Sequence, residues 1–201
     1  MNLLPFRIAF ALIFALNFII MARYRSQAQQ GRSFSYEQEG RALAVALRVA
    51  GFTVWLYAVV YIVAPGLLEW SVIDLPAWLR WLGAAVALLA VPPLAIWAQR
   101  ALGRNVSTTV ITHEDHELIT TGPYRYVRHP LYTIGFLFFS SLALLAASWF
   151  LAVAIVVVFI LLALRTPTEE RMLRRHFGAA YEGYSRRTGR YLPRLSWGNQ
   201  D

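Results

Sequence analysis

The sequence predicts an all-α protein that crosses a membrane several times, and three observations support that prediction. Hydrophobic residues make up 58% of the 201 residues and charged residues only 15%, against roughly 45–50% and about 25% in soluble domains. The apolar residues form four runs that reach or approach the length of a membrane helix. The positive charge, all of it arginine, is concentrated between alternate runs. Composition therefore excludes an ordinary soluble domain, a fibre and a disordered chain.

The first three runs are each expected to form one membrane helix. They cover residues 3–22, 43–64 and 78–98. The first run is not followed by a small-residue cleavage site, so a membrane helix is favoured over a signal peptide. Pro92 and Pro93 should kink the third helix, because proline removes a backbone donor and crowds the preceding turn.

The fourth run, residues 131–164, contains no charged residue. As one helix it would be roughly 50 Å long, whereas the hydrocarbon core of a bilayer is about 30 Å thick. A tight hairpin at residues 146–149 is therefore expected, with a helix of about 16 residues on either side. The prediction is about five membrane helices, the last two forming a helical hairpin.

The placement of arginine predicts the orientation. Seventeen of the nineteen arginines lie in or beside the connections that follow the first, third and fifth helices. The positive-inside rule places these connections in the cytoplasm and accounts for the net charge of +8, so no nucleic-acid partner is expected. Residues 1–98 are predicted to form an N-terminal region of three membrane helices. Residues 99–201 are predicted to form the catalytic region, with its polar segments together on the cytoplasmic side.

Absent residue types exclude further functions. The chain has no cysteine, which excludes a disulfide scaffold, a cysteine-ligated metal and a cysteine nucleophile. It has no lysine, so Schiff-base and lysine general-base chemistry are excluded too. The exclusive use of arginine is typical of a GC-rich genome and points to a bacterial source.

The segment before the fourth helix combines a turn with a helix start. Gly122 and Pro123 mark the turn, and Pro130 suits the first position of the helix, where its missing N–H costs nothing. His129 then lies at the helix mouth, where unsatisfied amides and the positive end of the dipole favour a carboxylate. Taken alone, His129 and Pro130 would be a helix-start signal without further function.

An acidic and histidine-rich stretch precedes this turn. It consists of His113, Glu114, Asp115, His116 and Glu117, which are residue types that can ligate a metal. A solvated loop is the favoured interpretation, because no further ligand cluster completes a zinc pattern. No metal site is predicted.

The segment after the fifth helix is expected to open a new helix. Thr166, Pro167 and Glu169 fit a capping box, in which a threonine and a glutamate satisfy each other's backbone amides. Taken alone, Glu169 and Glu170 would be capping and helix-pair residues. Arg165 alone would be an anchor whose guanidinium reaches the bilayer edge.

Three motifs follow one another in the second half of the chain. They are Gly122-x-Tyr124-x-x-x-Arg128-His129-Pro130-x-Tyr132, then Arg165-x-x-x-Glu169-Glu170, and then Phe177-Gly178-x-x-Tyr181-x-x-Tyr184. This ordered pattern, with an apolar hairpin after the first motif, closely resembles the isoprenylcysteine carboxyl methyltransferase family. The related phospholipid N-methyltransferases share its general form. The resemblance covers residues 100–195, whereas the first two helices match only in hydropathy.

The resemblance implies that S-adenosyl-L-methionine binds in a pocket on the cytoplasmic side. The positions that match the cofactor-binding residues of the family are His116, Glu117, Leu118, Ile119, Tyr124, His129, Pro130, Leu131, Tyr132 and Glu169. Arg165 matches the arginine associated with the substrate, and it is the residue expected to be catalytic. Pro167 interrupts a stretch that the family usually writes without proline, and Thr188 stands where the family usually has valine.

Methyl transfer to a carboxylate suits these side chains. The transfer is an in-line displacement at a sulfonium, so positioning and the exclusion of water supply most of the catalysis. A carboxylate is ionised near neutral pH and needs no general base, and Arg165 can hold it bidentately. Glu169 would receive the ammonium of the cofactor and the amides near His129 its carboxylate. An amine acceptor would instead need His129 or a glutamate as a base.

The function expected from the sequence is methyl transfer from S-adenosyl-L-methionine to the carboxylate of a lipid-like or prenylcysteine-type substrate. That substrate is expected to enter from the bilayer lipids, in a bacterial inner membrane or, in a eukaryote, the endoplasmic reticulum. Three alternatives remain: a phospholipid or amine N-methyltransferase, an NADPH-dependent protein similar to sterol reductases, and a membrane scaffold without enzymatic activity. The sterol reductases share an Arg-His-Pro-x-Tyr element but are much longer chains.

Overall fold

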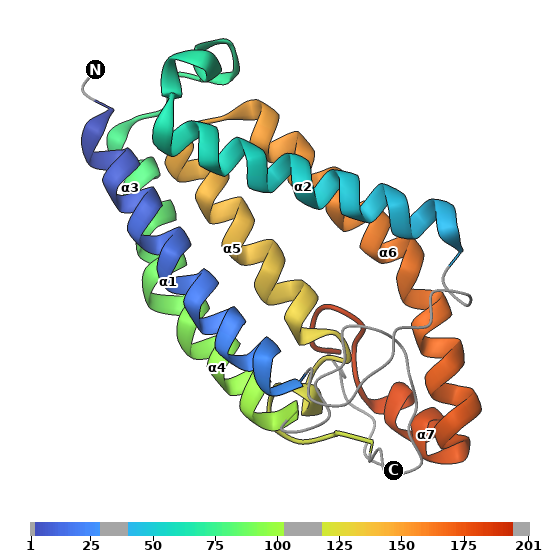
Figure 1. Cartoon of the computed structure of the whole chain (residues 1–201). Helices are drawn as coiled ribbons and strands as arrows, with labels where there is room; N and C mark the ends of the chain where they lie inside the picture. The colour runs from blue at the N-terminus through green and yellow to red at the C-terminus, as the bar shows by residue number, and fades with distance from the viewer. Residues whose placement is uncertain (1–2, 29–39, 103–117, 195–201) are drawn as a thin grey trace.

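The computed structural model describes residues 3–28, 40–102 and 118–194, which form a bundle of helices (Figure 1). The helices are α1 (Leu4–Ala28), α2 (Arg41–Val63), α3 (Ala77–Ala85), α4 (Val91–Leu102), α5 (Pro130–Ala146), α6 (Trp149–Phe177) and α7 (Ala179–Arg187). A π-helical turn, η2 (Val86–Ala90), joins α3 to α4, and the connections contain two 3-10 helices, η1 (Pro65–Ser71) and η4 (Gly122–Arg125). Within these ranges the β pairing is limited to isolated bridges. The all-α prediction is confirmed.

Five apolar rods run through the bundle. Four are long and apolar enough to cross a bilayer, namely α1, α2, α6 and the rod of α3, η2 and α4 that covers Ala77–Leu102. The fifth, α5, is apolar but has only 17 residues. Because successive rods alternate in direction, α4 and α6 end where α2 and α5 begin (Figure 1). We call this the arginine-rich end, and the opposite end, where α5 turns into α6, the hairpin end.

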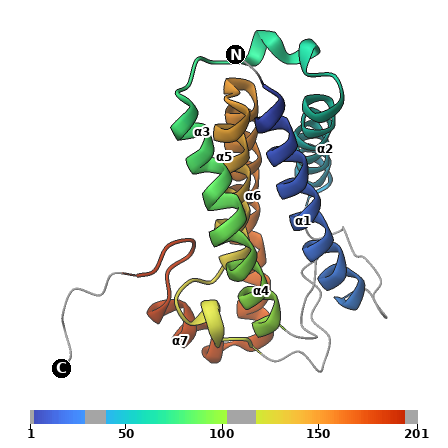
Figure 2. The ribbon, with the colours of Figure 1, turned by 90° about the vertical axis from the view of Figure 1, so that its left-hand side faces the viewer.

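Helix α5 is the centre of the bundle. It packs against α1, α3, α4 and α6, while α2 packs along α6 (Figures 1 and 2). At the crossing with α3, a Cβ atom on Gly83 would lie 2.6 Å from the carbonyl oxygen of Ser141, so only glycine allows this approach. Close contact through small residues is the usual way in which helices associate in a membrane. These contacts join helices from both sides of residue 98, and the division there into two regions stays a prediction.

The hairpin between α5 and α6 forms where the length argument placed it. Ala147 has a left-handed backbone with φ of 53°, and its N–H donates to the Leu144 carbonyl at 3.1 Å. Ser148 caps the next helix, because its hydroxyl accepts a hydrogen bond from the Leu151 N–H at 3.1 Å. The second helix of the hairpin, α6, is longer than the roughly 16 residues expected, since it has 29 residues.

The expected new helix at Thr166 is wrong, because α6 runs through Pro167 without a break. The Thr166 hydroxyl donates back to the Leu162 carbonyl at 2.8 Å rather than capping a helix start. A proline removes one backbone hydrogen bond from a helix, and the polar contacts that Arg165 and Glu169 make across α6 favour continuity. Pro92 and Pro93, which were expected to kink the third helix, lie in the first turn of α4, after the π-helical turn. A π-helical turn is itself a common site of helix kinks.

The two arginines at the hairpin end have structural roles. Arg80 is 2% exposed, and its Nε donates to the Leu145 carbonyl at 2.9 Å while its guanidinium lies 3.7 Å above the Phe6 ring. Arg7 donates to the Ile62 carbonyl at 2.7 Å. Both arginines therefore bond carbonyls in the last turns of α5 and α2, where helices leave acceptors unsatisfied.

Candidate functional site

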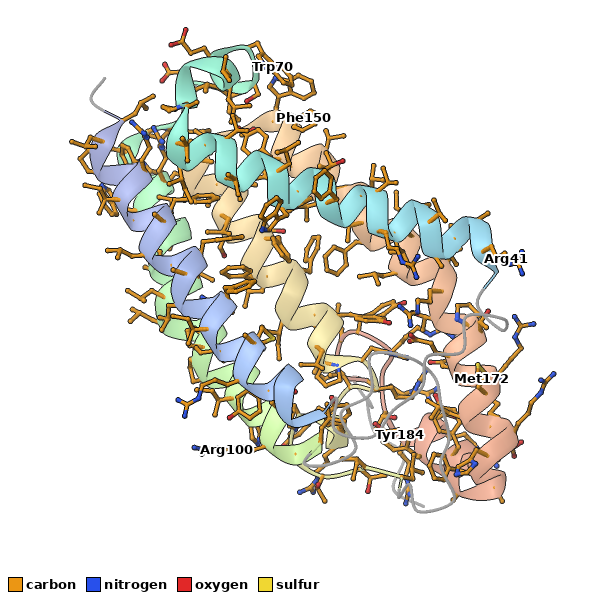
Figure 3. All side chains as sticks on the ribbon, in the orientation of Figure 1. Arg41, Trp70, Arg100, Phe150, Met172 and Tyr184 are labelled. Carbon is orange, nitrogen blue, oxygen red and sulfur yellow. The ribbon has the colours of Figure 1, made fainter. Side chains whose placement is uncertain are left out.

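The candidate site lies at the arginine-rich end, where four segments meet. They are the start of α5, the second half of α6, α7 and a short segment that we call the strap (Thr188–Tyr191). Figure 3 shows Tyr184 of α7 at this end, between the start of α5 and the end of α6. Helix α6 has 29 residues and is therefore roughly 43 Å long. This exceeds the hydrocarbon thickness of about 30 Å, so the polar residues in its second half lie beyond the apolar part of the bundle.

Glu169 is surrounded by a hydroxyl, a guanidinium and an imidazole. The Tyr132 hydroxyl lies 2.8 and 2.9 Å from the two carboxylate oxygens. The Arg165 Nε lies 2.9 Å from Oε1 in an ion pair that spans one turn of α6. The His129 Nδ1 is 3.7 Å from Oε2. The structure thus brings Arg165 and two predicted cofactor residues, Tyr132 and His129, around the carboxylate of a third, Glu169.

Glu170 is the centre of a second cluster, and it is not among the site residues predicted from the sequence. Its side chain is 1% exposed, and Arg128 donates from Nε to Oε1 at 3.0 Å. Arg190 donates to both oxygens, from Nε at 3.1 Å and from Nη2 at 2.8 Å. Arg174 lies 3.7 Å away on the next turn of α6. The only sequence signal was the pairing of Glu170 with Glu169, because Arg128 and Arg190 are distant along the chain.

His129 lies between the two clusters. Its ring is stacked on Tyr132, with centroids 5.3 Å apart and an angle of 15° between the planes. The buried Nε2 atom is 3.5 Å from Oε1 of Glu170, yet it has no aligned hydrogen bond among the described residues. The His129 amide, which the sequence suggested for a cofactor carboxylate, donates instead to the Arg190 carbonyl at 3.0 Å.

Tyr124 is buried beneath the site. The Tyr184 hydroxyl donates to the Tyr124 carbonyl at 2.8 Å, which ties η4 to α7. Burial raises the pKa of the Tyr184 phenol to about 12 and also raises the pKa of Tyr124, so both phenols stay neutral at physiological pH. This position supports a packing role for Tyr124, and its role toward a cofactor stays a prediction.

The remaining predicted residues are placed as follows. Pro130 is buried and begins α5, and Leu131 packs against the hydrophobic core. Leu118 and Ile119 are half-buried in the segment before η4. His116 and Glu117, with the rest of the acidic and histidine-rich stretch, lie outside the described residues. Within the described ranges no three His, Asp or Glu side chains gather in a way that could hold a metal ion.

The fold and the site define a multi-pass helical membrane protein whose polar site is built at one end of an apolar hairpin. The family model described as phospholipid methyltransferase matches residues 78–180, about half of the chain. The chain therefore belongs to the phospholipid methyltransferase family.

Proteins with similar sequences include two of bacterial origin. The nickel-cobalt-cadmium resistance protein NccN of Alcaligenes xylosoxydans xylosoxydans is 36% identical over 121 residues, which cover 58% of this chain and 54% of NccN. YpbQ of Bacillus subtilis (strain 168) is 29% identical over 98 residues, covering 48% of this chain and 58% of YpbQ. The chain thus spans little more than half the length of these relatives.

A solved structure shares the fold. It is the eukaryotic intramembrane Ras methyltransferase ICMT (isoprenylcysteine carboxyl methyltransferase), with a TM-score of 0.56, 20% sequence identity, and coverage of 92% of this chain and 67% of that one.

Proposed function

We propose that the protein is a membrane methyltransferase that uses S-adenosyl-L-methionine. The observation that supports this most directly is the Glu169 carboxylate, which Tyr132, Arg165 and His129 surround. Membership of the phospholipid methyltransferase family and the fold shared with a Ras methyltransferase favour the same activity. When bound, the cofactor supplies an activated methyl group.

The described residues fit such a cofactor. A carboxylate is the natural partner of an ammonium group, and Glu169 is 13% exposed, so it remains accessible while largely shielded from water. The Nδ1 atom of His129, which lies 3.7 Å from Oε2 of Glu169, offers a further polar contact beside the same carboxylate. The stacked rings of His129 and Tyr132 provide a flat aromatic surface beside the carboxylate.

Arg165 is the proposed substrate residue. It directly follows the apolar part of α6, and its side chain is 16% exposed, so the guanidinium lies where a lipid-borne substrate would reach the polar site. A guanidinium can hold a carboxylate through two parallel hydrogen bonds. We therefore propose that the acceptor is the carboxylate of a lipid-like or prenylcysteine-type molecule that enters from the bilayer.

A second acceptor class is an amine, as in a phospholipid headgroup. An amine loses a proton when it is methylated and so needs a base. His129 lies 3.7 Å from one carboxylate and 3.5 Å from another, which makes it a candidate to take up that proton. The description of the matching family also favours this alternative.

A methyl-transfer assay with labelled cofactor tests the proposal and separates the two acceptor classes. Purified protein in lipid nanodiscs would be offered prenylcysteine carboxylates or phosphatidylethanolamine. Label that mild alkali releases as methanol identifies an ester, whereas alkali-stable label on the headgroup identifies an N-methyl product. Transfer to neither class, together with binding of NADPH, would instead favour a reductase-like protein.

The side of the membrane is part of the proposal. We propose that the arginine-rich end faces the cytoplasm, in the inner membrane of a bacterium, because of the charge bias of its connections. The chain has no cysteine, so Arg175→Cys at one end and Glu69→Cys at the other give single probes. An impermeant maleimide added to whole cells should label only the second variant. Labelling of the first variant alone would reverse the orientation.

A further inference from the structure

The strap crosses the mouth of α5 and is bonded to it by the backbone. Gly189 donates to the Tyr126 carbonyl at 3.2 Å and accepts from the Arg128 N–H at 2.9 Å. The next residue, Arg190, accepts from the His129 N–H at 3.0 Å. These bonds form a short parallel contact between the strap and residues 126–129. The residue that the cofactor proposal uses, His129, is therefore part of this contact.

Side chains extend the contact to α5 and α6. The Thr133 hydroxyl donates to the Tyr191 carbonyl at 2.7 Å, and the Tyr191 hydroxyl lies 2.6 Å from the Thr166 hydroxyl. The strap also has a tight path, because a Cβ atom on Gly189 would collide with the Leu192 carbonyl. The strap is thus fitted to one position above the site rather than resting loosely on it.

Glu170 joins the two sides of the contact. Arg128 comes from the segment before α5 and Arg190 from the strap, and both donate to Oε1 of the same buried carboxylate. Arg128 also donates to the carbonyls of Ser185 and Thr188, so it bonds the C-terminal end of α7 and the start of the strap. The hydrogen bonds with Glu170 raise the pKa of Arg190 above its ordinary value.

We propose that Glu170 is a positioning residue. Its carboxylate accepts hydrogen bonds from both Arg128 and Arg190, an arrangement that we call the clasp. The clasp fixes the strap and holds the His129 ring beside Glu169. The proposal rests on the proposed function, in which His129 and Glu169 face the cofactor. Glu170 itself does not touch the cofactor in this account. It acts through the segments that it joins.

The burial of this ion cluster supports a positioning role. Removing charges from water is costly, and buried ion pairs often contribute little net stability compared with apolar residues of similar size. In several proteins such groups instead specify one arrangement of the chain. Here the cluster connects three segments that are far apart in sequence, at the point where the candidate site needs them in register.

The test compares Glu170→Gln and Arg190→Gln with a matched exposed pair. Glu182 and Arg186 form an ion pair of 3.8 Å on α7, with side chains 59% and 77% exposed, so Glu182→Gln and Arg186→Gln are the controls. Hydrogen–deuterium exchange of the amides at 128, 129 and 189 reports on the clasp without any ligand. Calorimetry with S-adenosylhomocysteine reports on the site.

If the clasp holds the strap, exchange at amides 128, 129 and 189 should rise at least tenfold in both test variants. It should stay at the wild-type rate in both controls. S-adenosylhomocysteine affinity should fall at least fivefold in Glu170→Gln, and Arg190→Lys should recover part of the loss seen in Arg190→Gln. Unchanged exchange in Arg190→Gln, whose half-exposed side chain can be replaced without unfolding the bundle, would overturn the proposal. If the wild type does not bind S-adenosylhomocysteine, the proposed function fails, while the exchange measurement still decides whether the clasp exists.

Discussion

Glu169 and Glu170 are adjacent in the sequence but have different environments. Successive residues of a helix point about 100° apart, so one carboxylate faces Tyr132 and the mouth of α5, while the other faces the strap and α7. Glu169 is 13% exposed and Glu170 1%. Glu169 is held by the side chains of Tyr132 and Arg165. Glu170 is held by Arg128 and Arg190, which also take part in the backbone hydrogen bonds between the strap and residues 126–129. The difference separates a group suited to binding a ligand from one suited to holding the protein in place.

The largest expected effect is on stability. Glu170→Ala leaves two guanidinium groups without their shared acceptor, and breaking a buried ion cluster in this way costs about 3 kcal/mol. Glu169→Ala should cost less, because Glu169 pairs with one arginine, Arg165, and its side chain is 13% exposed rather than 1%. Denaturant-induced unfolding in a mild detergent measures both. Equal costs would remove the distinction between the two carboxylates.

The next effect concerns turnover. Arg165→Lys keeps the positive charge beside Glu169 but loses the planar fork, so turnover should fall at least tenfold while cofactor affinity changes less than threefold. Arg171→Lys is the matched control, because Arg171 is an exposed arginine on the same helix that donates only to Thr168 among the described contacts. Turnover near the wild-type value in Arg165→Lys would show that Arg165 is only an interfacial anchor.

A smaller effect is expected when Glu169 loses one partner. Tyr132→Phe keeps the ring stacked on His129 but removes the hydroxyl that bonds the carboxylate. The affinity for S-adenosylhomocysteine should fall by about threefold to tenfold, because the hydroxyl acts on the ligand only through the carboxylate and an ordinary hydrogen bond contributes about 0.5–1.5 kcal/mol net. Tyr126→Phe is the control, since Tyr126 is 51% exposed. A change as large as that of Glu169→Gln would mean that the hydroxyl itself, rather than the carboxylate, determines affinity.

The apolar part of the fold could be predicted because its causes are local. The length of residues 131–164 exceeds what a bilayer can accommodate, and that alone placed the hairpin at residues 146–149. The helix start expected at Thr166 was wrong because a long membrane helix can accommodate a proline when side chains make polar contacts across it. Arg165 and Glu169, one turn apart on α6, are such a pair.

The candidate site could be predicted only in part. Arg165, His129, Tyr132 and Glu169 could be found because they occur in recognisable motifs. Glu170 could not be assigned a role, because its partners come from the segment before α5 and from the strap, and no spacing in the sequence brings them together. The same limit applies to the His129 amide, whose partner in the strap appears only in the folded chain.

The central claim is that Glu169 receives the cofactor, and calorimetry with S-adenosylhomocysteine tests it most directly. The wild type and the control Glu182→Gln should bind with the same affinity. Glu169→Gln should bind at least tenfold more weakly, because a hydrogen bond to a charged group contributes about 1.5–3 kcal/mol, while its thermal unfolding shows that it remains folded. A folded Glu169→Gln variant with an affinity within twofold of the wild type would contradict the account.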